Sequence, residues 1–252
     1  MNSPSPMRIA TVPGTPLLIP EVAAGAAGEF DDVRAAAIAR VAWAAGTTGG
    51  VTVLAQDPSV MSVNPIELPA EVSLRSLGVP RQVPTQVGRL TDRSEAEGVL
   101  GEASRSLPVA VLVAAWLAHA AQVRVDAAWS VPVDPARVSG DDISAIGTGQ
   151  GVVLIADGSC TRTAKAPGSL VEGSVEFDDA IVAALVATDG DYFCNPDRSV
   201  DAATFQVQGL GVWALASHLI GHSAVGDWIG EVDLTADPLG VMYVVGGWHL
   251  IT

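Results

Sequence analysis

The sequence predicts an α/β fold in which helices cover both faces of a doubly wound, mostly parallel central sheet, giving three α/β/α layers. Short apolar runs that show no polar face alternate with segments of helical periodicity. Of the 252 residues, 49% are hydrophobic and 16% are charged, which is typical of a well-packed globular chain. No long Pro, Ser or Gly tract interrupts the middle of the chain, so we expect one domain over residues 1–252.

The first elements are expected to form a parallel βαβ unit. Residues 7–12 have the composition of a short strand, and residues 51–55 (VTVLA) are a fully apolar run of strand length. A helix over 29–45 is predicted between them, with acidic residues in its first turn, where the helix dipole favours them. Its predicted buried face consists of Val33, Ala37, Val41 and Ala44.

Prolines puncture residues 56–105, where we expect loops with one or two short strands. Beyond this region the patterns predict a helix at 108–120, a strand at 123–133, a short helix begun by Ser139 or Asp141, a buried strand at 151–156, helices at 177–187 and 204–225, and a last strand at 241–245.

Two stretches imitate targeting or membrane segments. Residues 8–28 end in a small-residue run, but several prolines and Glu21 break the apolar core that a signal peptide requires. Residues 106–123 are Ala-rich and contain Pro108 and His119, so we expect a buried core helix there. Two cysteines, Cys160 and Cys194, cannot build a disulfide framework in a chain of this size, and a cytoplasmic location is expected.

The charge balance is strongly acidic, with 28 acidic and 13 basic residues and a net charge of −15. Such a surface repels phosphate backbones and anionic lipids, so we expect no nucleic-acid partner and no membrane partner. The high apolar content leaves room for a homo-oligomer. The chain has a single lysine, Lys165, three positions from Arg162, which makes this loop the expected positive spot.

Ligands of doubly wound folds bind outside the carboxyl ends of the strands, which directs attention to loops 13–19, 56–65 and 157–168. The third loop concentrates polar groups directly after a buried strand. Asp157 could act there as a base or ligand, while Arg162 and Lys165 could hold an anionic group. The alternative is a polar surface turn in which Asp157 caps backbone amides and the two cations pair with acids.

Other candidate motifs are weaker. His218 and His222 have a spacing that can chelate a metal, but no third ligand is evident. The glycines of 147–151 precede a strand and favour a turn over a phosphate-binding loop. Ser159 lacks the glycine pattern of a nucleophile elbow because Thr161 stands at the second glycine position, and nothing fixes the exposure of Cys160.

Three segments carry a family resemblance: residues 11–22 (TVPGTPLLIPEV), residues 156–168 (ADGSCTRTAKAPG) followed by Phe177 and Asp178, and residues 237–243 (DPLGVMY). Together they resemble a bacterial branch of the family that is similar to the B subunit of class III extradiol ring-cleavage dioxygenases. The resemblance implies a doubly wound α/β fold. In active members it also implies a non-haem Fe(II), held by two histidines and a carboxylate, that opens a catechol-type ring with O₂.

This chain departs from the family at the metal ligands. The first ligand histidine falls on Gly14, and the second is expected directly after residues 51–55, where Gln56, Asp57 and Pro58 stand. The loop after 151–156 offers Asp157, Ser159 and Cys160 in place of the catalytic histidine. Since glycine has no side chain to coordinate a metal, we expect no cofactor held by the family ligands.

Three hypotheses follow. In the first, a metal-independent protein binds a small molecule, with an anionic one as an option, in the strand-end cleft, with or without new chemistry at Asp157, Ser159 and Lys165. Its binding residues are Gly14, Thr15, Asp57, Asp157, Ser159, Arg162 and Lys165. In the second, a divergent metal-dependent dioxygenase or hydrolase holds Fe(II) or Zn with substitute ligands such as Asp57, Asp157, His218 or His222. In the third, the chain is a non-catalytic assembly or interaction protein with a vestigial cleft.

Overall fold

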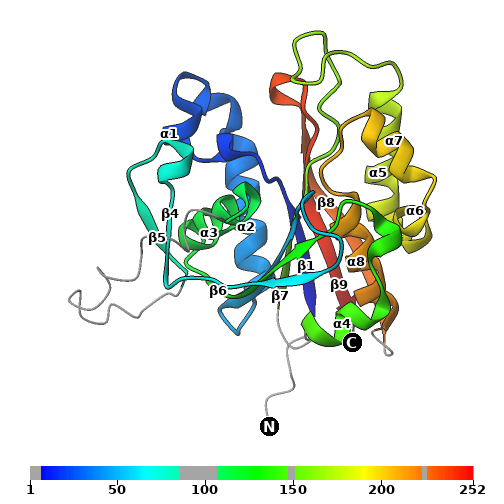
Figure 1. Cartoon of the computed structure of the whole chain (residues 1–252), viewed down its shortest axis with the longest axis horizontal. Helices are drawn as coiled ribbons and strands as arrows, with labels where there is room; N and C mark the ends of the chain where they lie inside the picture. The colour runs from blue at the N-terminus through cyan, green and yellow to red at the C-terminus, as the bar shows by residue number, and fades with distance from the viewer. Residues whose placement is uncertain (1–6, 86–106, 147–150, 223–225, 252) are drawn as a thin grey trace.

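A mixed seven-stranded sheet forms the centre of the chain in the computed structural model, which describes residues 7–85, 107–146, 151–222 and 226–251 (Figure 1). The strand order is β3-β6-β2-β7-β1-β9-β8. These strands are β1 (Arg8–Val12), β2 (Gly50–Gln56), β3 (Asn64–Ile66), β6 (Arg124–Val131), β7 (Gly151–Ile155), β8 (Asp227–Ala236) and β9 (Tyr243–Ile251). Two further strands, β4 (Glu71–Ser73) and β5 (Gln82–Pro84), pair separately as a small antiparallel sheet.

The four central strands, β6, β2, β7 and β1, run parallel to one another. β3 and β9, which flank them, run antiparallel to them, and the edge strand β8 pairs antiparallel with β9. The expectation of a mostly parallel sheet therefore holds only for the centre. β1 and β2 are parallel as predicted, but β7 lies between them and pairs with both. The carboxyl ends of β1, β2 and β7 consequently lie next to one another at the same end of the sheet.

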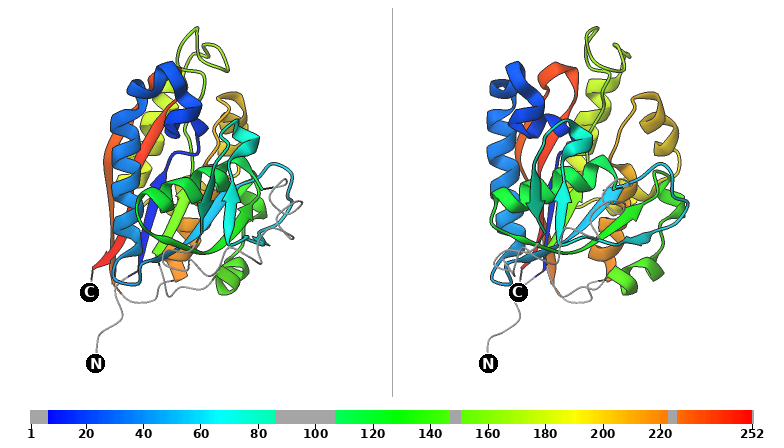
Figure 2. Two further views of the ribbon diagram at one scale, coloured as in Figure 1. Left: turned by 90° about the vertical axis from the view of Figure 1, so that its left-hand side faces the viewer. Right: turned by 60° about the vertical axis from the view of Figure 1, so that its left-hand side comes forward.

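Helices pack on both faces of this sheet (Figures 1 and 2). One hydrophobic cluster joins α2 and α3 to side chains such as Ala10, Val53 and Val153, and a second joins α4, α5 and α8 to Ile9, Leu54 and Leu154. Successive strand residues thus face opposite layers, as the pleat requires. The α-helices are α1 (Pro20–Ala23), α2 (Asp31–Ala45), α3 (Val109–Ala120), α4 (Gly140–Ile146), α5 (Ser174–Ala187), α6 (Gly190–Cys194), α7 (Arg198–Thr204) and α8 (Leu210–His222).

Short 3₁₀ turns connect several of these elements. They are η1 (Pro16–Leu18), η2 (Ala24–Phe30), η3 (Arg75–Leu77), η6 (Pro135–Arg137) and η7 (Pro238–Gly240). The turn η2 shortens the helix predicted over 29–45, which begins at Asp31. The predicted face of α2 is confirmed, because Val33, Ala37, Val41 and Ala44 are all buried.

The apolar segment at 106–123 contains the 12-residue helix α3, which is buried on almost every side. Among the described residues, no helix has both the length and the apolar character needed to cross a bilayer. Helix α3 packs against α2 and the small β4–β5 sheet. Its N-terminus, at Val109, borders the edge of the sheet where β1, β2 and β7 end.

Several elements differ from the sequence prediction. Residues 56–85 contain three short strands where one or two were expected, and the helix predicted at 204–225 begins at Leu210 because the segment before it bridges to Asp157. Strand β8 and the helices α6 and α7 were not predicted. β8 lies at the edge of the sheet, where exposed and half-buried residues alternate along its whole length. The turn expected at 147–150, residues 86–105 and the last part of the predicted helix, 223–225, lie outside the described residues.

Candidate functional site

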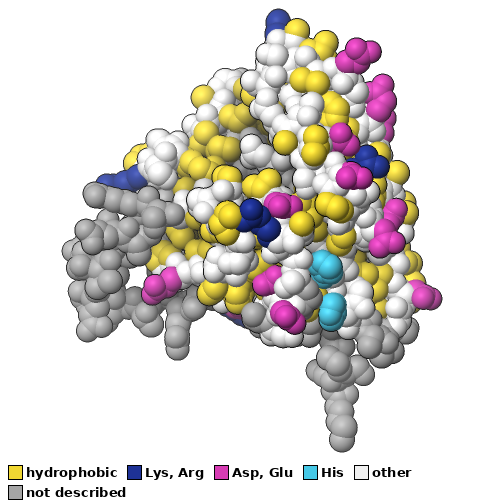
Figure 3. Space-filling model, turned by 45° about the vertical axis from the view of Figure 1, so that its right-hand side comes forward, with side chains coloured by type: hydrophobic (Ala, Val, Ile, Leu, Met, Phe, Trp, Pro, Cys, Tyr) yellow, Lys and Arg dark blue, Asp and Glu magenta, His cyan; other side chains and the backbone are white. Residues whose placement is uncertain are grey.

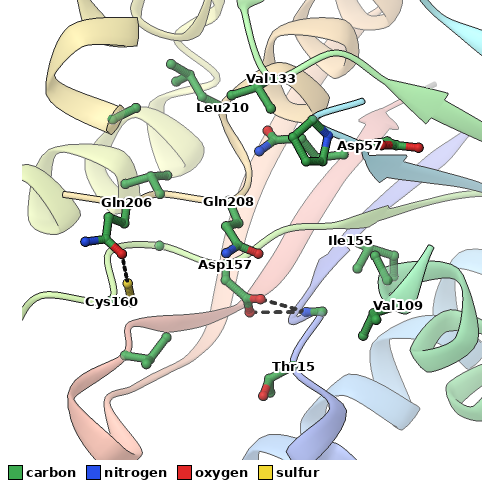
Figure 4. Close-up of a pocket in the computed structure, with 18 of the residues that line it drawn as sticks. Thr15, Asp57, Val109, Val133, Ile155, Asp157, Cys160, Gln206, Gln208 and Leu210 are labelled. Atoms are coloured by element: carbon green, nitrogen blue, oxygen red, sulfur yellow. Dashed lines mark hydrogen bonds between the residues drawn. The ribbon is translucent and has the colours of Figure 1, made fainter. Parts of the chain in front are cut away.

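A cavity of about 1110 Å³ lies at the carboxyl ends of β1, β2 and β7 (Figure 4). The loop after β1 contributes Gly14 and Thr15, the loop after β2 contributes Asp57, and the loop after β7 contributes Asp157 and Cys160. The start of β9, the N-terminus of α3 and the segment between α7 and α8 complete the wall. The three loops singled out in the sequence therefore meet at one cavity.

The wall is mainly apolar, with separate polar groups. Its apolar members are Pro16, Leu17, Pro58, Pro108, Val109, Ala110, Val133, Ile155, Pro167, Ala202, Ala203, Val207, Leu210, Leu239 and Val241. Its polar members are Thr15, Gln56, Asp57, Ser59, Asp134, Asp157, Cys160, Ser199, Gln206, Gln208 and Tyr243. Ligand pockets commonly combine an apolar wall with a few polar groups that orient the ligand.

Asp157 is the carboxyl group at the centre of this site (Figure 4). The backbone N–H of Gly14 donates to both of its carboxylate oxygens, at 3.1 and 3.2 Å. Its own backbone N–H and C=O pair with Gln208 at 3.1 and 3.0 Å, which fixes the side chain's direction. Burial raises the pKa of Asp157 to about 7, although the Gly14 hydrogen bond acts in the opposite direction. The carboxyl group can therefore accept or donate a proton at neutral pH.

Gly14 allows this arrangement because its backbone approaches its neighbours closely. A Cβ atom at position 14 would lie 2.7 Å from Cγ2 of Ile155 and 3.4 Å from a carboxylate oxygen of Asp157. Ile155 is buried in β7 and β-branched, so it has little freedom to move away. The position that the family resemblance assigns to a metal-ligating histidine thus has no room even for a methyl group without a local shift.

We expect Gly14→Ala to lower the free energy of unfolding by about 1 to 3 kcal/mol, because overpacking in a rigid wall costs this much. Chemical denaturation of the variant would measure the loss. Gly25→Ala is the matched control, since no atom lies within 4 Å of a Cβ built there. Equal stability of the two variants would contradict the close packing at Gly14.

Tyr243 and Thr15 form a second polar group in the wall. Their side chains are hydrogen-bonded, and the hydroxyl of Thr15 also accepts from the backbone N–H of Leu17 at 3.3 Å. Burial raises the pKa of Tyr243, and the nearby negative charge of Asp157 raises it further. The Tyr243 hydroxyl therefore stays protonated at neutral pH and can serve as a hydrogen-bond partner for a ligand.

Cys160 lines the cavity as a protonated thiol. Its Sγ donates to Oε1 of Gln206 at 3.3 Å. Burial raises the pKa of the thiol, and the charge of Asp157 acts in the same direction. Because the thiolate is the reactive form of cysteine, these surroundings do not activate Cys160 as a nucleophile.

Asp57 and Gln56 follow β2 and are held by protein partners. Partial burial acts to raise the pKa of Asp57, but hydrogen bonds from the hydroxyl and N–H of Ser59 and from the Ser130 hydroxyl lower it overall. Gln56 accepts at Oε1 from the N–H of Gly211 at 3.2 Å, in the first turn of α8. Its side chain thereby satisfies one of the free amides at the N-terminus of that helix.

The structure separates the predicted site residues into two groups. Gly14, Thr15, Asp57 and Asp157 line the cavity, whereas Ser159, Arg162 and Lys165 do not. Ser159 is fully buried and donates from its hydroxyl and its N–H to Asp178, at 2.6 and 2.9 Å.

The expected positive spot lies outside the cavity wall. Arg162 faces two carboxylates, with its Nε 3.6 Å from Asp178 and its Nη1 3.8 Å from Asp237, and Lys165 is exposed on the loop. The backbone N–H of Arg162 donates to the carbonyl oxygen of Gly240, and the side chain is directed to these two carboxylates, whereas the same loop reaches the cavity wall at Pro167. The prediction that these two cations hold an anionic ligand group in the cleft is therefore not supported by their positions.

Sequence reasoning missed Tyr243, Gln206 and Gln208 as wall residues. Tyr243 begins a strand that pairs with β1 from the far end of the chain. The glutamines reach the site through the bridge between Gln208 and Asp157 and the hydrogen bonds of Cys160 to Phe205 and Gln206. No local motif marks any of them. The resemblance of residues 237–243 to the family, which includes Tyr243, was the one available signal.

The side chains at this site do not fit the Fe(II) centre that the resemblance implies. Among the described residues, no three His, Cys, Asp or Glu side chains lie close enough together to hold a metal ion. None of the four histidines lines the cavity. On α8, a ring nitrogen of His222 lies 2.9 Å from the carbonyl oxygen of His218. Nε2 of His218 lies 3.8 Å from Sγ of Cys194. The proposed substitute ligands Asp57, Asp157, His218 and His222 are thus not gathered into one centre.

Comparison with known proteins gives no further assignment. No protein-family model matches the chain, and no curated protein matches it significantly. The functional interpretation therefore depends on the geometry of the cavity and on the residues that line it.

Proposed function

We propose that this chain binds a small molecule in the cavity at the ends of β1, β2 and β7, with Asp157 as the polar group that contacts it. The observation that carries the proposal is a partly buried carboxyl group, of pKa about 7, that borders a cavity of about 1110 Å³. A carboxyl group with a strongly shifted pKa in a concave site is a common mark of function.

We also propose that the chain is a divergent, doubly wound relative of the extradiol dioxygenase B-subunit-like family whose binding does not require the family's Fe(II) ligands. Residues from all three segments that carry the resemblance lie in the cavity wall: Thr15 from the first, Asp157 from the second and Tyr243 from the third. The absence of space at Gly14 argues against a ligand histidine at that position.

A second candidate function is proton transfer, for which the pKa of Asp157 is the supporting observation. A general base works best when its pKa lies near the working pH. The other residues considered for chemistry are unsuited, because Ser159 is fully buried and Lys165 lies outside the wall. A catalytic role would therefore depend on Asp157, with Tyr243 as a neighbouring hydroxyl.

Blocking the cavity tests the binding proposal. Val109 lies at the rim and is 47% exposed, so Val109→Trp is expected to fold normally and to fill the entrance. Compounds from a fragment library that raise the thermal midpoint of the wild type should lose this effect in Val109→Trp.

Val186→Trp is the matched control, because Val186 is 51% exposed on α5 and does not line the cavity. It should retain every thermal shift that the wild type shows. If the fragments act equally on wild type and Val109→Trp, they bind elsewhere, and the cavity is not the binding site.

A further inference from the structure

We infer that the ligand of this cavity carries an ammonium group on an apolar body, and that the ammonium donates hydrogen bonds to the carboxylate of Asp157. The inference depends on the proposed function, since it names the class of molecule bound at the same site. It reverses the charge that the sequence suggested for the ligand.

The charges that line the cavity are negative. Among the described residues of the wall, the carboxylates are Asp57, Asp134 and Asp157, and no Lys, Arg or His is present. Acidic side chains are also spread over the face of the molecule in Figure 3, where basic ones occur at few places. The electrostatic field of such a wall favours cations and disfavours anions.

Of these three carboxylates, Asp157 has the fewest donors from the described part of the chain. Asp134 accepts from the N–H of Ala136 and from Nε of Arg137, and Asp57 accepts from Ser59 and Ser130. Within the described part of the chain, both oxygens of Asp157 share a single donor, the N–H of Gly14. A carboxylate has about four acceptor positions, so Asp157 retains capacity for the donors of an ammonium group.

Protein groups occupy most positions that would attract an anion. Arg162 is paired with Asp178 and Asp237, and Gln56 accepts from the first turn of α8. The N-terminus of α3, at Val109, has no side-chain cap and borders the cavity. Its partial charge of about half an elementary charge is smaller than the full charge of an ionised Asp157. The cavity therefore offers a cation the stronger interaction.

The desolvation of Asp157 gives the interaction a recognisable pH dependence. Burial disfavours the ionised carboxylate of Asp157, and an ammonium partner stabilises it again. Below pH 7 most Asp157 carboxyl groups are protonated, so binding of an ammonium group there must release a proton. Two ionisable groups interact with Asp157, Tyr243 at the start of β9 and Cys160 on the same loop, and both stay neutral. Asp57, after β2, lines the same cavity and is ionised. Affinity for an amine should thus rise with pH up to about 7 and level off above it.

The apolar body is accommodated by the wall around this carboxylate. Its apolar lining residues come from several elements and include Leu17, Val109, Val133, Ile155, Leu210 and Leu239. Burial of an apolar body contributes about 25 cal/mol for each Å² removed from water. An amine without such a body gains only the contact with Asp157.

Three probes of equal size test the inference: benzylamine, benzyl alcohol and benzoate, titrated by ligand-detected NMR at pH 6 and pH 8. At pH 8 benzylamine should bind about tenfold more tightly than benzyl alcohol, because a hydrogen bond to a charged group contributes about 1.5 to 3 kcal/mol. Benzoate should bind most weakly. The affinity for benzylamine should fall about tenfold at pH 6, and the affinity for benzyl alcohol should change little.

Asp157→Asn should abolish the preference for benzylamine and its pH dependence, while the control Asp227→Asn, on the edge strand β8, should preserve both. Tightest binding of benzoate, or an equal affinity for benzylamine in wild type and Asp157→Asn, would overturn the ligand class and leave the proposed function standing. If none of the three probes binds the wild type, the ligand class is wrong. If, in addition, Val109→Trp loses no fragment, the proposed function is wrong as well.

Discussion

Asp157→Asn is expected to be more stable than the wild type at pH 8, by about 2 to 4 kcal/mol. The pKa of Asp157 is about 7 in the folded protein and 3.8 in an unperturbed chain, and each pH unit between the two corresponds to about 1.4 kcal/mol. The folded state binds this proton more tightly than the unfolded state, so the wild type loses stability as pH rises from about 4 to about 7. Asparagine keeps the shape and an oxygen that accepts from Gly14, but it has no charge to bury.

Urea denaturation at pH 5.5 and pH 8 would measure this effect. The stability difference between Asp157→Asn and wild type should grow by about 2 kcal/mol between these two pH values. Asp227→Asn, which removes an exposed carboxylate, should show no such growth. A difference that is independent of pH would mean that Asp157 titrates as an ordinary surface aspartate. The proposed function would then lack the shifted carboxyl group on which it depends.

The second large effect is expected at Asp178, which lies outside the cavity and holds the loop that carries Asp157. This carboxylate is buried and accepts from the hydroxyl and the N–H of Ser159, and the guanidinium of Arg162 lies beside it. Asp178→Ala leaves these buried donors without their acceptor. We expect a loss of about 3 kcal/mol in the free energy of unfolding, because breaking a buried charge pair has this cost.

Asp179→Ala is the matched control for this variant, since Asp179 is the next residue on α5 and is exposed. It should change stability by less than about 0.5 kcal/mol. Asp178→Ala should also increase the rate at which a thiol reagent modifies Cys160, because the loop that buries this thiol is released. Equal stabilities for the two variants would show that Asp178 does not hold the loop.

The buried elements of the fold could be predicted from the sequence because their signals are local. The apolar run of β7 is buried at all five positions, and the apolar run of β2 is buried at all but its last. Strand β8 was not predicted, and the strand predicted for β9 was too short. The pairing of β9 with β1 joins distant parts of the chain, so a local pattern does not show it. The mixed character of the sheet follows from that same pairing, which no local pattern encodes.

For the candidate site, the sequence by itself determined the acidic charge, the buried strands and the loops that follow them, because composition and hydrophobic periodicity are properties of neighbouring residues. Only the tertiary structure decided which loop side chains reach the cavity. Asp157 faces it because Gly14 and Gln208 fix its backbone and carboxylate. A few residues later, the side chain of Arg162 is directed to Asp178 and Asp237 instead, and Lys165 is exposed outside the wall. The direction of a side chain in a loop depends on hydrogen bonds to distant segments, and these form only when the chain has folded.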